Sequence, residues 1–342
     1  MERGFEVYRT NQKVRNMKLV YIIAQGHTGS TLMDCILGTH PEFISNGELM
    51  YLNWQLERTK DQKKTKVETQ TLCTCKKDFR SCDYWSKVFD EVKDKSNKNI
   101  AEEPTSFDTA YFGEFSFKER GGFKISKENK NNEKKVYKGL MRGKSLEDML
   151  KIEPKIIDWL KNNWLLYESM SKVADKSVVI DSSKSFLRML LLQKYRPKDV
   201  MVIFINRNSR GLTSSMKRRL KKMGRSEILA LPYVIFTKLK YRFKIRAIKK
   251  NIKDLTYLEV DYDYFVSKPS DFLGKVVQKL ELKNEYKKQV NESFYIDPSQ
   301  QHLVAGNPMR YKGRQKVKYD NRWKKSLNKI ELLALNLFFG EK

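Results

Sequence analysis

The stretch Tyr21-Ile22-Ile23-Ala24-Gln25-Gly26-His27-Thr28-Gly29-Ser30-Thr31-Leu32 decides the fold of this chain. The apolar run over residues 19–24 is short and rich in β-branched side chains, which predicts a buried strand. A glycine-containing turn follows over residues 25–30. Residues 31–37 then predict a helix that ends at Gly38. The stretch therefore has a strand–loop–helix layout.

Such a layout is typical of a phosphate-binding loop. Gly26 and Gly29 allow several backbone N–H groups to point inward, and the helix adds its free N–H groups and the positive end of its dipole. The loop is not a Walker A motif, which has four residues between its glycines followed by Lys and Ser or Thr. Here two residues separate the glycines and no Lys precedes Ser30, which favours a phosphate bound without Mg²⁺. The alternative is a plain glycine turn between strand and helix.

The rest of the chain repeats the alternation of strand and helix. Further short apolar runs predict strands over residues 178–180, 200–205 and 255–260. Helical patterns cover residues 156–165, 187–195 and 272–280. The alternation predicts an α/β fold, a P-loop-like parallel sheet flanked by helices, in which ligands bind at the carboxyl ends of the strands.

The chain divides into a basic N-terminal segment, residues 1–17, and a single domain over residues 18–342 with a large insertion. The insertion, residues 57–145, is rich in Lys, Glu and Asn and has weak apolar periodicity. It is either a lid or acceptor-binding region or a variable surface excursion without a role.

The composition limits the class of protein. The chain has 342 residues and a net charge of +28, which attracts polyanions such as nucleic acid, anionic lipid, sulfated glycan or a phosphorylated cofactor. A lysine-rich surface also serves solubility alone. No apolar stretch is long enough for a transmembrane helix, and no signal peptide is visible. We therefore expect a cytoplasmic protein, although a chain trimmed of a leader for export has the same appearance.

Three of the four cysteines, Cys73, Cys75 and Cys82, are close together and precede Tyr84-Trp85. A structural zinc site takes four ligands, normally with wider cysteine spacing, and no histidine lies nearby in the sequence. We therefore expect free or buried thiols and no metal, or a disulfide if the protein is exported.

A second candidate anion site follows the strand predicted over residues 200–205. Arg207 lies at the carboxyl end of that strand, where its guanidinium can bind a phosphate through two parallel hydrogen bonds. Ser215 lies eight residues on, in a basic helix. Alone, a basic helix start is usually a solvated surface. Paired with the loop over residues 25–32, it predicts two phosphate sites that hold one ligand.

With both segments identified, the chain resembles the PAPS-dependent sulfotransferase superfamily, and most closely its carbohydrate and tyrosyl types. PAPS is 3′-phosphoadenosine-5′-phosphosulfate. Residues 25–32 look like the 5′-phosphosulfate loop of the family, and the spacing from Arg207 to Ser215 looks like its 3′-phosphate motif. Further similar segments are residues 40–49, 260–265, 302–310 and 320–323. The chain departs from the pattern at Gln25, where many members have Arg or Lys, at His27, where many have Ser, and at Asn208-Ser209, where Asp-Pro is usual.

The resemblance implies a sulfotransferase that uses PAPS, releases adenosine 3′,5′-bisphosphate and requires no metal. The implied nucleotide-binding residues are Gln25, Gly26, His27, Thr28, Gly29, Ser30, Thr31, Leu32, Arg207, Ser215, Tyr262, Asn307 and Arg310. Glu48 is the expected general base, and His27 is the alternative. Lys184 or His27 is expected to replace the missing cation at the leaving phosphate.

The acceptor is expected to carry a hydroxyl or an amine, on a carbohydrate, a lipid, a small metabolite or a peptide. Nucleic acid is not expected as a substrate. Two other classes of protein remain open at this point. A small-molecule kinase would bind ATP with Mg²⁺, and a non-enzymatic polyanion-binding protein would bind DNA or heparin in a salt-sensitive way.

Overall fold

The computed structural model describes residues 17–60, 71–107, 127–145, 154–252, 254–282 and 293–341. Its centre is a five-stranded sheet in the order β2-β3-β1-β4-β5, and every neighbouring pair is parallel. The strands are β1 (Lys18–Ala24), β2 (Phe43–Ser45), β3 (Val178–Asp181), β4 (Val200–Asn206) and β5 (Thr256–Asp261). The predicted parallel α/β fold and its four predicted strands are confirmed.

The central strand β1 is paired along its length with β4, and Ile22 lies opposite Ile203. The chain leaves β1 for β2 and β3 on one side and then crosses to β4 and β5 on the other. The strand order therefore reverses beside β1, which is where open α/β sheets form a ligand-binding crevice. Polar segments follow β1, β2, β3 and β4 at this edge.

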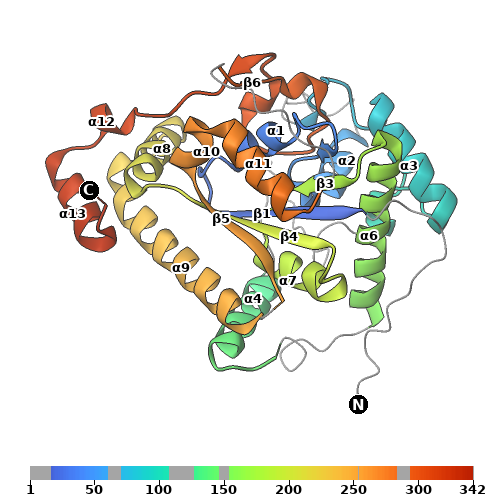
Figure 1. Cartoon of the computed structure of the whole chain (residues 1–342), viewed down its shortest axis with the longest axis horizontal. Coiled ribbons are helices and arrows are strands. Elements are labelled where there is room, and N and C mark those ends of the chain that lie inside the picture. Colours follow the sequence, from blue (N-terminus) through green and yellow to red (C-terminus); the bar gives the residue numbers. More distant parts are fainter. Residues whose placement is uncertain are drawn as a thin grey trace.

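The two faces of the sheet carry separate apolar layers, because successive strand residues point to opposite sides. Leu19, Tyr21 and Ile23 face a layer that includes α3 (Asp83–Ser96), α6 (Pro154–Ala174) and α7 (Phe186–Tyr195). The residues between them face the layer of α1 (Ser30–Leu37), α10 (Tyr262–Ser267) and α11 (Pro269–Lys279). Figure 1 shows the helices on both sides of the sheet.

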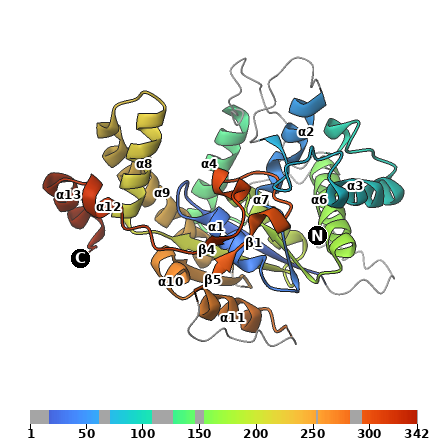
Figure 2. The same cartoon turned by 90° about the horizontal axis from the view of Figure 1, so that it is seen from above.

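The remaining elements lie at the edges of this sandwich. They are α2 (Leu52–Lys60), α4 (Lys127–Met141), α8 (Ser209–Lys222), α9 (Ala230–Asn251), α12 (Trp323–Ser326), α13 (Lys329–Phe339), β6 (Tyr295–Ile296), β7 (Gln315–Lys316) and the 3-10 turns Leu49–Tyr51, Pro104–Ser106, Glu227–Leu229, Pro298–Gln300 and Pro308–Tyr311. Figure 2 shows α8 and α9 beside the sheet, with α12 and α13 beyond them.

Several elements were not predicted, among them β2 and α9. β2 has only three residues, and its pairing with β3 stabilises it. α9 has apolar side chains on its exposed surface, including Phe236, which is 69% exposed, so no single apolar stripe marks it.

The described part of the insertion is built into the main core. Trp85, Val88 and Val92 of α3 are buried in the same layer as β1 and α6. Val136 and Leu140 of α4 belong to this layer too. Among the described residues, no helix has a run apolar and long enough to cross a membrane.

Candidate active site

The loop between β1 and α1 has a conformation that depends on Gly29. This residue precedes α1 with φ at +86°, in the left-handed region. A Cβ atom at Gly29 would lie 2.7 Å from the ring of Tyr262, so the close approach also requires glycine. Gly29 has no side chain that could cap α1, and the first N–H groups of the helix are therefore suited to bind an anion.

Arg207 joins the second candidate anion segment to this loop. Its Nη1 donates a hydrogen bond of 2.6 Å to the carbonyl oxygen of His27. Its guanidinium carbon lies 4.1 Å from the ring centroid of Tyr262. The structure thus brings together the two segments that the sequence paired, at the carboxyl ends of β1 and β4.

A carboxylate occupies the centre of an arginine cluster beside Arg207. Asp320 Oδ2 lies 3.1 Å from Arg207 Nη2 and 3.5 Å from Arg218 Nη2. Arg322 donates to the same carboxylate at 2.7 and 2.9 Å. Hydrogen bonds from Arg322, with the charge of Arg207, lower the pKa of Asp320. We name Arg207, Arg218, Arg322 and Asp320 the arginine cluster; three cations face one anion in it.

Ser215 lies at the rim of the arginine cluster, where its Oγ accepts a hydrogen bond of 3.3 Å from Arg218 Nη2. The sequence had singled out Ser215 and Arg207 but neither Arg218 nor Asp320 as site residues. The basic run after Ser215 was a signal for Arg218. For Asp320, which lies between β7 and α12, the signal was the resemblance of residues 320–323 to the family, which gave the residue no role.

The predicted base is paired with a cation. Lys184 Nζ donates to Glu48 Oε1 at 2.6 Å, and the two side chains are 22% and 13% exposed. Lys184, the third residue after the end of β3, has φ at +64°. Asp181 holds this turn in place. It accepts hydrogen bonds from the backbone N–H of Ser183 at 2.9 Å and from the fully buried Arg188 at 3.2 Å.

His27 lies between the arginine cluster and the Glu48–Lys184 pair. Its Nε2 is 3.3 Å from Arg219 Nη1, where the guanidinium donates. Burial and the positive charges of Arg219 and Lys184 lower the pKa of His27 to about 4. The imidazole is therefore neutral at pH 7 and acts as a hydrogen-bond acceptor toward Arg219. This argues against His27 as the proton donor or as the missing cation.

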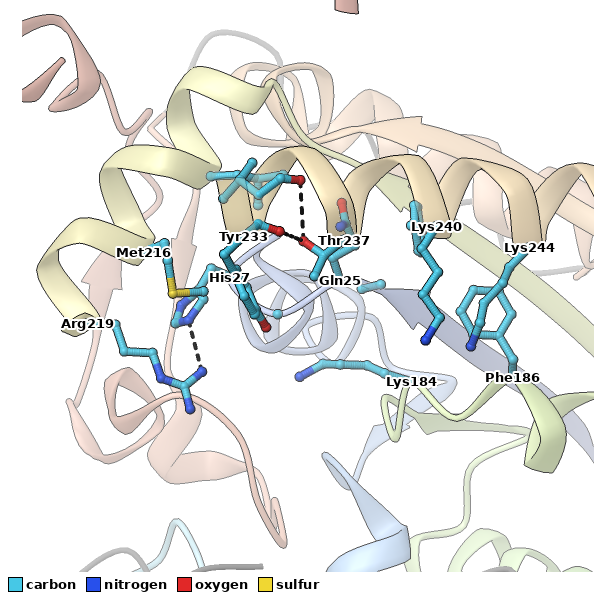
Figure 3. A pocket seen from close by; sticks show the side chains of 15 residues that line it. Gln25, His27, Lys184, Phe186, Met216, Arg219, Tyr233, Thr237, Lys240 and Lys244 are labelled. Carbon is cyan, nitrogen blue, oxygen red and sulfur yellow. Dashed lines mark hydrogen bonds between the residues drawn. The ribbon is translucent and has the colours of Figure 1, made fainter. Parts of the chain in front are cut away.

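A cavity of about 250 Å³ opens beside His27 and Lys184, between the loop, α8 and α9 (Figure 3). Its cationic lining side chains are Lys184, Arg219, Lys240 and Lys244. Its aromatic lining side chains are Phe186, Tyr233 and Tyr241. The cavity therefore combines positive charge with flat apolar surfaces, next to the predicted base and the phosphate loop.

The C-terminal segment covers the other side of the loop. The backbone N–H of Asn307 donates to Thr31 Oγ1 at 3.0 Å, and a Cβ at Gly306 would lie 2.8 Å from the same oxygen. Asn307 is thus at the loop, as the resemblance implied. Arg310 is 2% exposed and donates to the carbonyl oxygen of Leu303 at 2.9 Å, so it has no surface for a nucleotide.

Tyr262 is buried under Gly29 and beside Arg207, with 5% of its surface exposed. It supports the loop and the guanidinium, whereas the resemblance implied an approach to adenine. Another supporting residue, Asp34 of α1, was not singled out by the sequence. It accepts a hydrogen bond of 2.7 Å from Ser182 and one from Ser45, and burial raises its pKa to about 7.

Comparison with known proteins gives structural likeness only. No protein-family model matches the chain, and no curated protein matches it. The chain is similar to the sulfotransferase domain from the curacin biosynthetic pathway, with 12% identity and a TM-score of 0.44 over 95% of this chain and 98% of that one. It is also similar to a sulfotransferase from Mycobacterium avium, with 12% identity and a TM-score of 0.42 over 95% and 75%.

A third similar structure is the sulfotransferase domain of an olefin synthase from Synechococcus PCC 7002, with 15% identity and a TM-score of 0.38 over 97% and 98%. All three are sulfotransferases. These TM-scores are below 0.5, so the likeness is one of fold and does not assign a role to any residue of the site.

Proposed function

We propose that this protein is a sulfotransferase that moves a sulfuryl group from PAPS to an acceptor hydroxyl or amine. The observation that carries the proposal is the hydrogen bond from Arg207 to His27, which joins the two anion segments. A donor with phosphate groups at both its 5′ and 3′ positions needs two such segments within one nucleotide of each other.

The residues fit this donor chemically. The N-terminus of α1, with Ser30 and Thr31, holds the 5′-phosphate. The arginine cluster holds the 3′-phosphate, and Ser215 contributes its hydroxyl. The contacts of Asp320 support this assignment. Its carboxylate oxygens contact three guanidinium groups, and phosphate oxygens bind guanidinium groups in the same way. A bound 3′-phosphate therefore replaces the Asp320 carboxylate at some of these guanidinium contacts.

The acceptor enters through the cavity beside Lys184. Its hydroxyl or amine attacks sulfur in line, a new bond to sulfur forms, and the bond between sulfur and the 5′-phosphate oxygen breaks. Glu48 takes the proton of the attacking group. Lys184 holds the Glu48 carboxylate in place and adds a positive charge near the loop. The cationic and aromatic lining of the cavity favours an acceptor with a negative charge and a flat apolar part.

The proposal is tested by thermal shift with adenosine 3′,5′-bisphosphate, ATP with Mg²⁺, and heparin. We expect the bisphosphate to raise Tm, and the rise should increase with its concentration. At a concentration of 100 times its Kd, the free energy of unfolding should be higher by about 2.7 kcal/mol. Arg218→Ala is expected to reduce this gain strongly. The matched control is Arg225→Ala, which removes an exposed arginine outside the cluster.

Two results contradict the proposal. A larger shift with ATP and Mg²⁺ than with the bisphosphate favours a kinase. An equal shift with heparin in wild type and Arg218→Ala, with none for either nucleotide, favours a polyanion-binding protein. A direct assay with labelled PAPS and a panel of anionic phenols, carbohydrates and lipids then identifies the acceptor.

A further inference from the structure

The three clustered cysteines meet a histidine from the far end of the chain. Cys73, Cys75, Cys82 and His302 each offer one ligand atom, and these four atoms all lie within 4.8 Å of one another. His302 Nδ1 is 3.3 Å from Cys82 Sγ and 3.5 Å from Cys73 Sγ. The cysteines have no histidine near them in the sequence, because the fourth ligand lies 220 residues beyond Cys82.

Four of the six distances between these ligand atoms are of the size found in a tetrahedral metal site. With zinc–sulfur bonds near 2.3 Å and zinc–nitrogen bonds near 2.0 Å, tetrahedral angles place two sulfurs about 3.8 Å apart and a sulfur and a nitrogen about 3.5 Å apart. Cys82 Sγ lies 3.8 Å from Cys73 Sγ and 3.5 Å from Cys75 Sγ. The two sulfur–nitrogen distances, 3.3 and 3.5 Å, are of the expected size.

All three cysteines are free thiols, so no disulfide accounts for the cluster. A disulfide between two of them would leave the third thiol and the imidazole together without a covalent partner. Three thiolates and one imidazole form one of the ligand sets that structural zinc sites use. The set is complete with four protein ligands, as expected for a structural rather than a catalytic metal.

The surroundings hold the ligands in place. The ring of Tyr84 stacks on His302 with centroids 4.7 Å apart, and Trp85 Nε1 donates to the His302 carbonyl oxygen at 3.0 Å. Thr74 Oγ1 donates to the Gln301 carbonyl oxygen and accepts from the backbone N–H of Leu303 at 3.2 Å. These contacts fix both chain segments on either side of the four ligands.

We propose that Cys73, Cys75, Cys82 and His302 bind one structural Zn²⁺ ion. The metal joins the segment before α3 to the C-terminal segment. In Figures 1 and 2, these are the light-blue chain leading into α3 and the red chain that returns over the sheet.

This junction has a consequence for the candidate active site. From His302 the C-terminal segment continues to Val304, whose N–H donates to the Asn46 carbonyl oxygen at 2.8 Å. It then reaches Asn307, whose N–H donates to Thr31 Oγ1 at 3.0 Å. Asn46 lies two residues before Glu48. The zinc ion therefore fixes the segment that lies between Glu48 and Thr31, without touching either residue.

The test measures metal in the full-length protein purified without chelator under reducing conditions. We expect about one zinc per chain by elemental analysis, and release of that zinc when the thiols are titrated with a mercurial reagent. Cys75→Ser, which alters a partly exposed ligand, and His302→Asn are expected to hold less than about 0.1 zinc per chain. Cys35→Ala and His40→Asn are the matched controls, because they change a cysteine and a histidine outside the cluster, and they are expected to keep the metal.

A second measurement keeps the test valid if the ligand variants fold poorly. Wild-type protein from which zinc has been removed is titrated with Co²⁺, and we expect the intense visible absorption of a tetrahedral thiolate site with a stoichiometry of about one. Absence of zinc together with failure to bind added Zn²⁺ or Co²⁺ overturns the proposal. A disulfide found by mass spectrometry between two of the three cysteines in the reduced preparation also overturns it. Metal content is independent of transfer activity, so the result stands apart from the proposed function.

Discussion

Two carboxylates of the candidate active site, Glu48 and Asp320, have different surroundings. Glu48 has one close cation, Lys184, at 2.6 Å. Asp320 has three, Arg207, Arg218 and Arg322. The Glu48–Lys184 pair is one anion with one cation, whereas the arginine cluster keeps a positive excess. The proposed function assigns proton transfer to Glu48 and anion binding to the cluster around Asp320, and the variants below test whether this difference in surroundings corresponds to a difference in role.

The largest effect is expected from Glu48→Gln. The amide keeps the size of the side chain but cannot take a proton, so the transfer rate with PAPS falls by about 10²- to 10⁴-fold. Binding of adenosine 3′,5′-bisphosphate stays within a factor of about two, because the arginine cluster is unchanged. Asp320→Ala is the opposite test, and a larger loss of turnover there than in Glu48→Gln would exchange the roles of the two carboxylates.

The lowered pKa of His27 predicts that the stability of the protein depends on pH. The unfolded chain takes up a proton at His27 near pH 6.5, whereas the folded protein does so only near pH 4. The contribution of His27 to the free energy of unfolding is therefore fully present above pH 6.5. It is lost as the pH falls to 4, and the loss amounts to about 3 kcal/mol. Urea unfolding at pH 4.5 and pH 7 should show this difference in wild type and a smaller one in His27→Gln.

The control for this prediction is Arg219→Met, which removes the cation nearest to the imidazole. NMR titration should then give a His27 pKa closer to its ordinary value. An unchanged pKa would mean that burial and the remaining cations, Lys184, Arg207 and Arg218, lower it without Arg219.

A smaller effect is expected from Asp320→Asn. The carboxylate competes with a phosphate for the three arginines, so removing its charge should strengthen bisphosphate binding by about tenfold, or 1.4 kcal/mol. Calorimetric titration measures it, and Asp254→Asn serves as an exposed control at a distance from the site. Weaker binding in Asp320→Asn would mean that Asp320 positions the arginines for the ligand and does not compete with it.

The smallest effect is expected from Ser215→Ala, which removes one hydroxyl at the rim of the arginine cluster. A hydrogen bond of this kind contributes about 0.5–1.5 kcal/mol, so bisphosphate affinity should fall by about threefold to tenfold. The same titration measures it. Ser226→Ala, a change outside the cluster, should have no effect. Equal affinities in the two variants would remove Ser215 from the 3′-phosphate site.

The sequence by itself determined the elements that are continuous in the chain. Short runs rich in apolar residues predicted four of the five strands. Three of them, β1, β3 and β4, are buried on both faces and therefore need apolar side chains at nearly every position. The loop after β1 was predicted from its glycines. Arg207 was predicted near that loop because the carboxyl ends of parallel strands meet at one edge.

Only the tertiary structure decided which distant side chains meet. His302 reaches Cys82, Asp320 enters the arginine cluster, and Arg310 turns into the core, and none of these outcomes follows from local sequence. Periodicity and turn chemistry act over a few residues, whereas these contacts are fixed by the packing of the C-terminal segment against α1, α8 and the segment before α3. The short strand β2 has the same cause, since its three residues are held by pairing with β3.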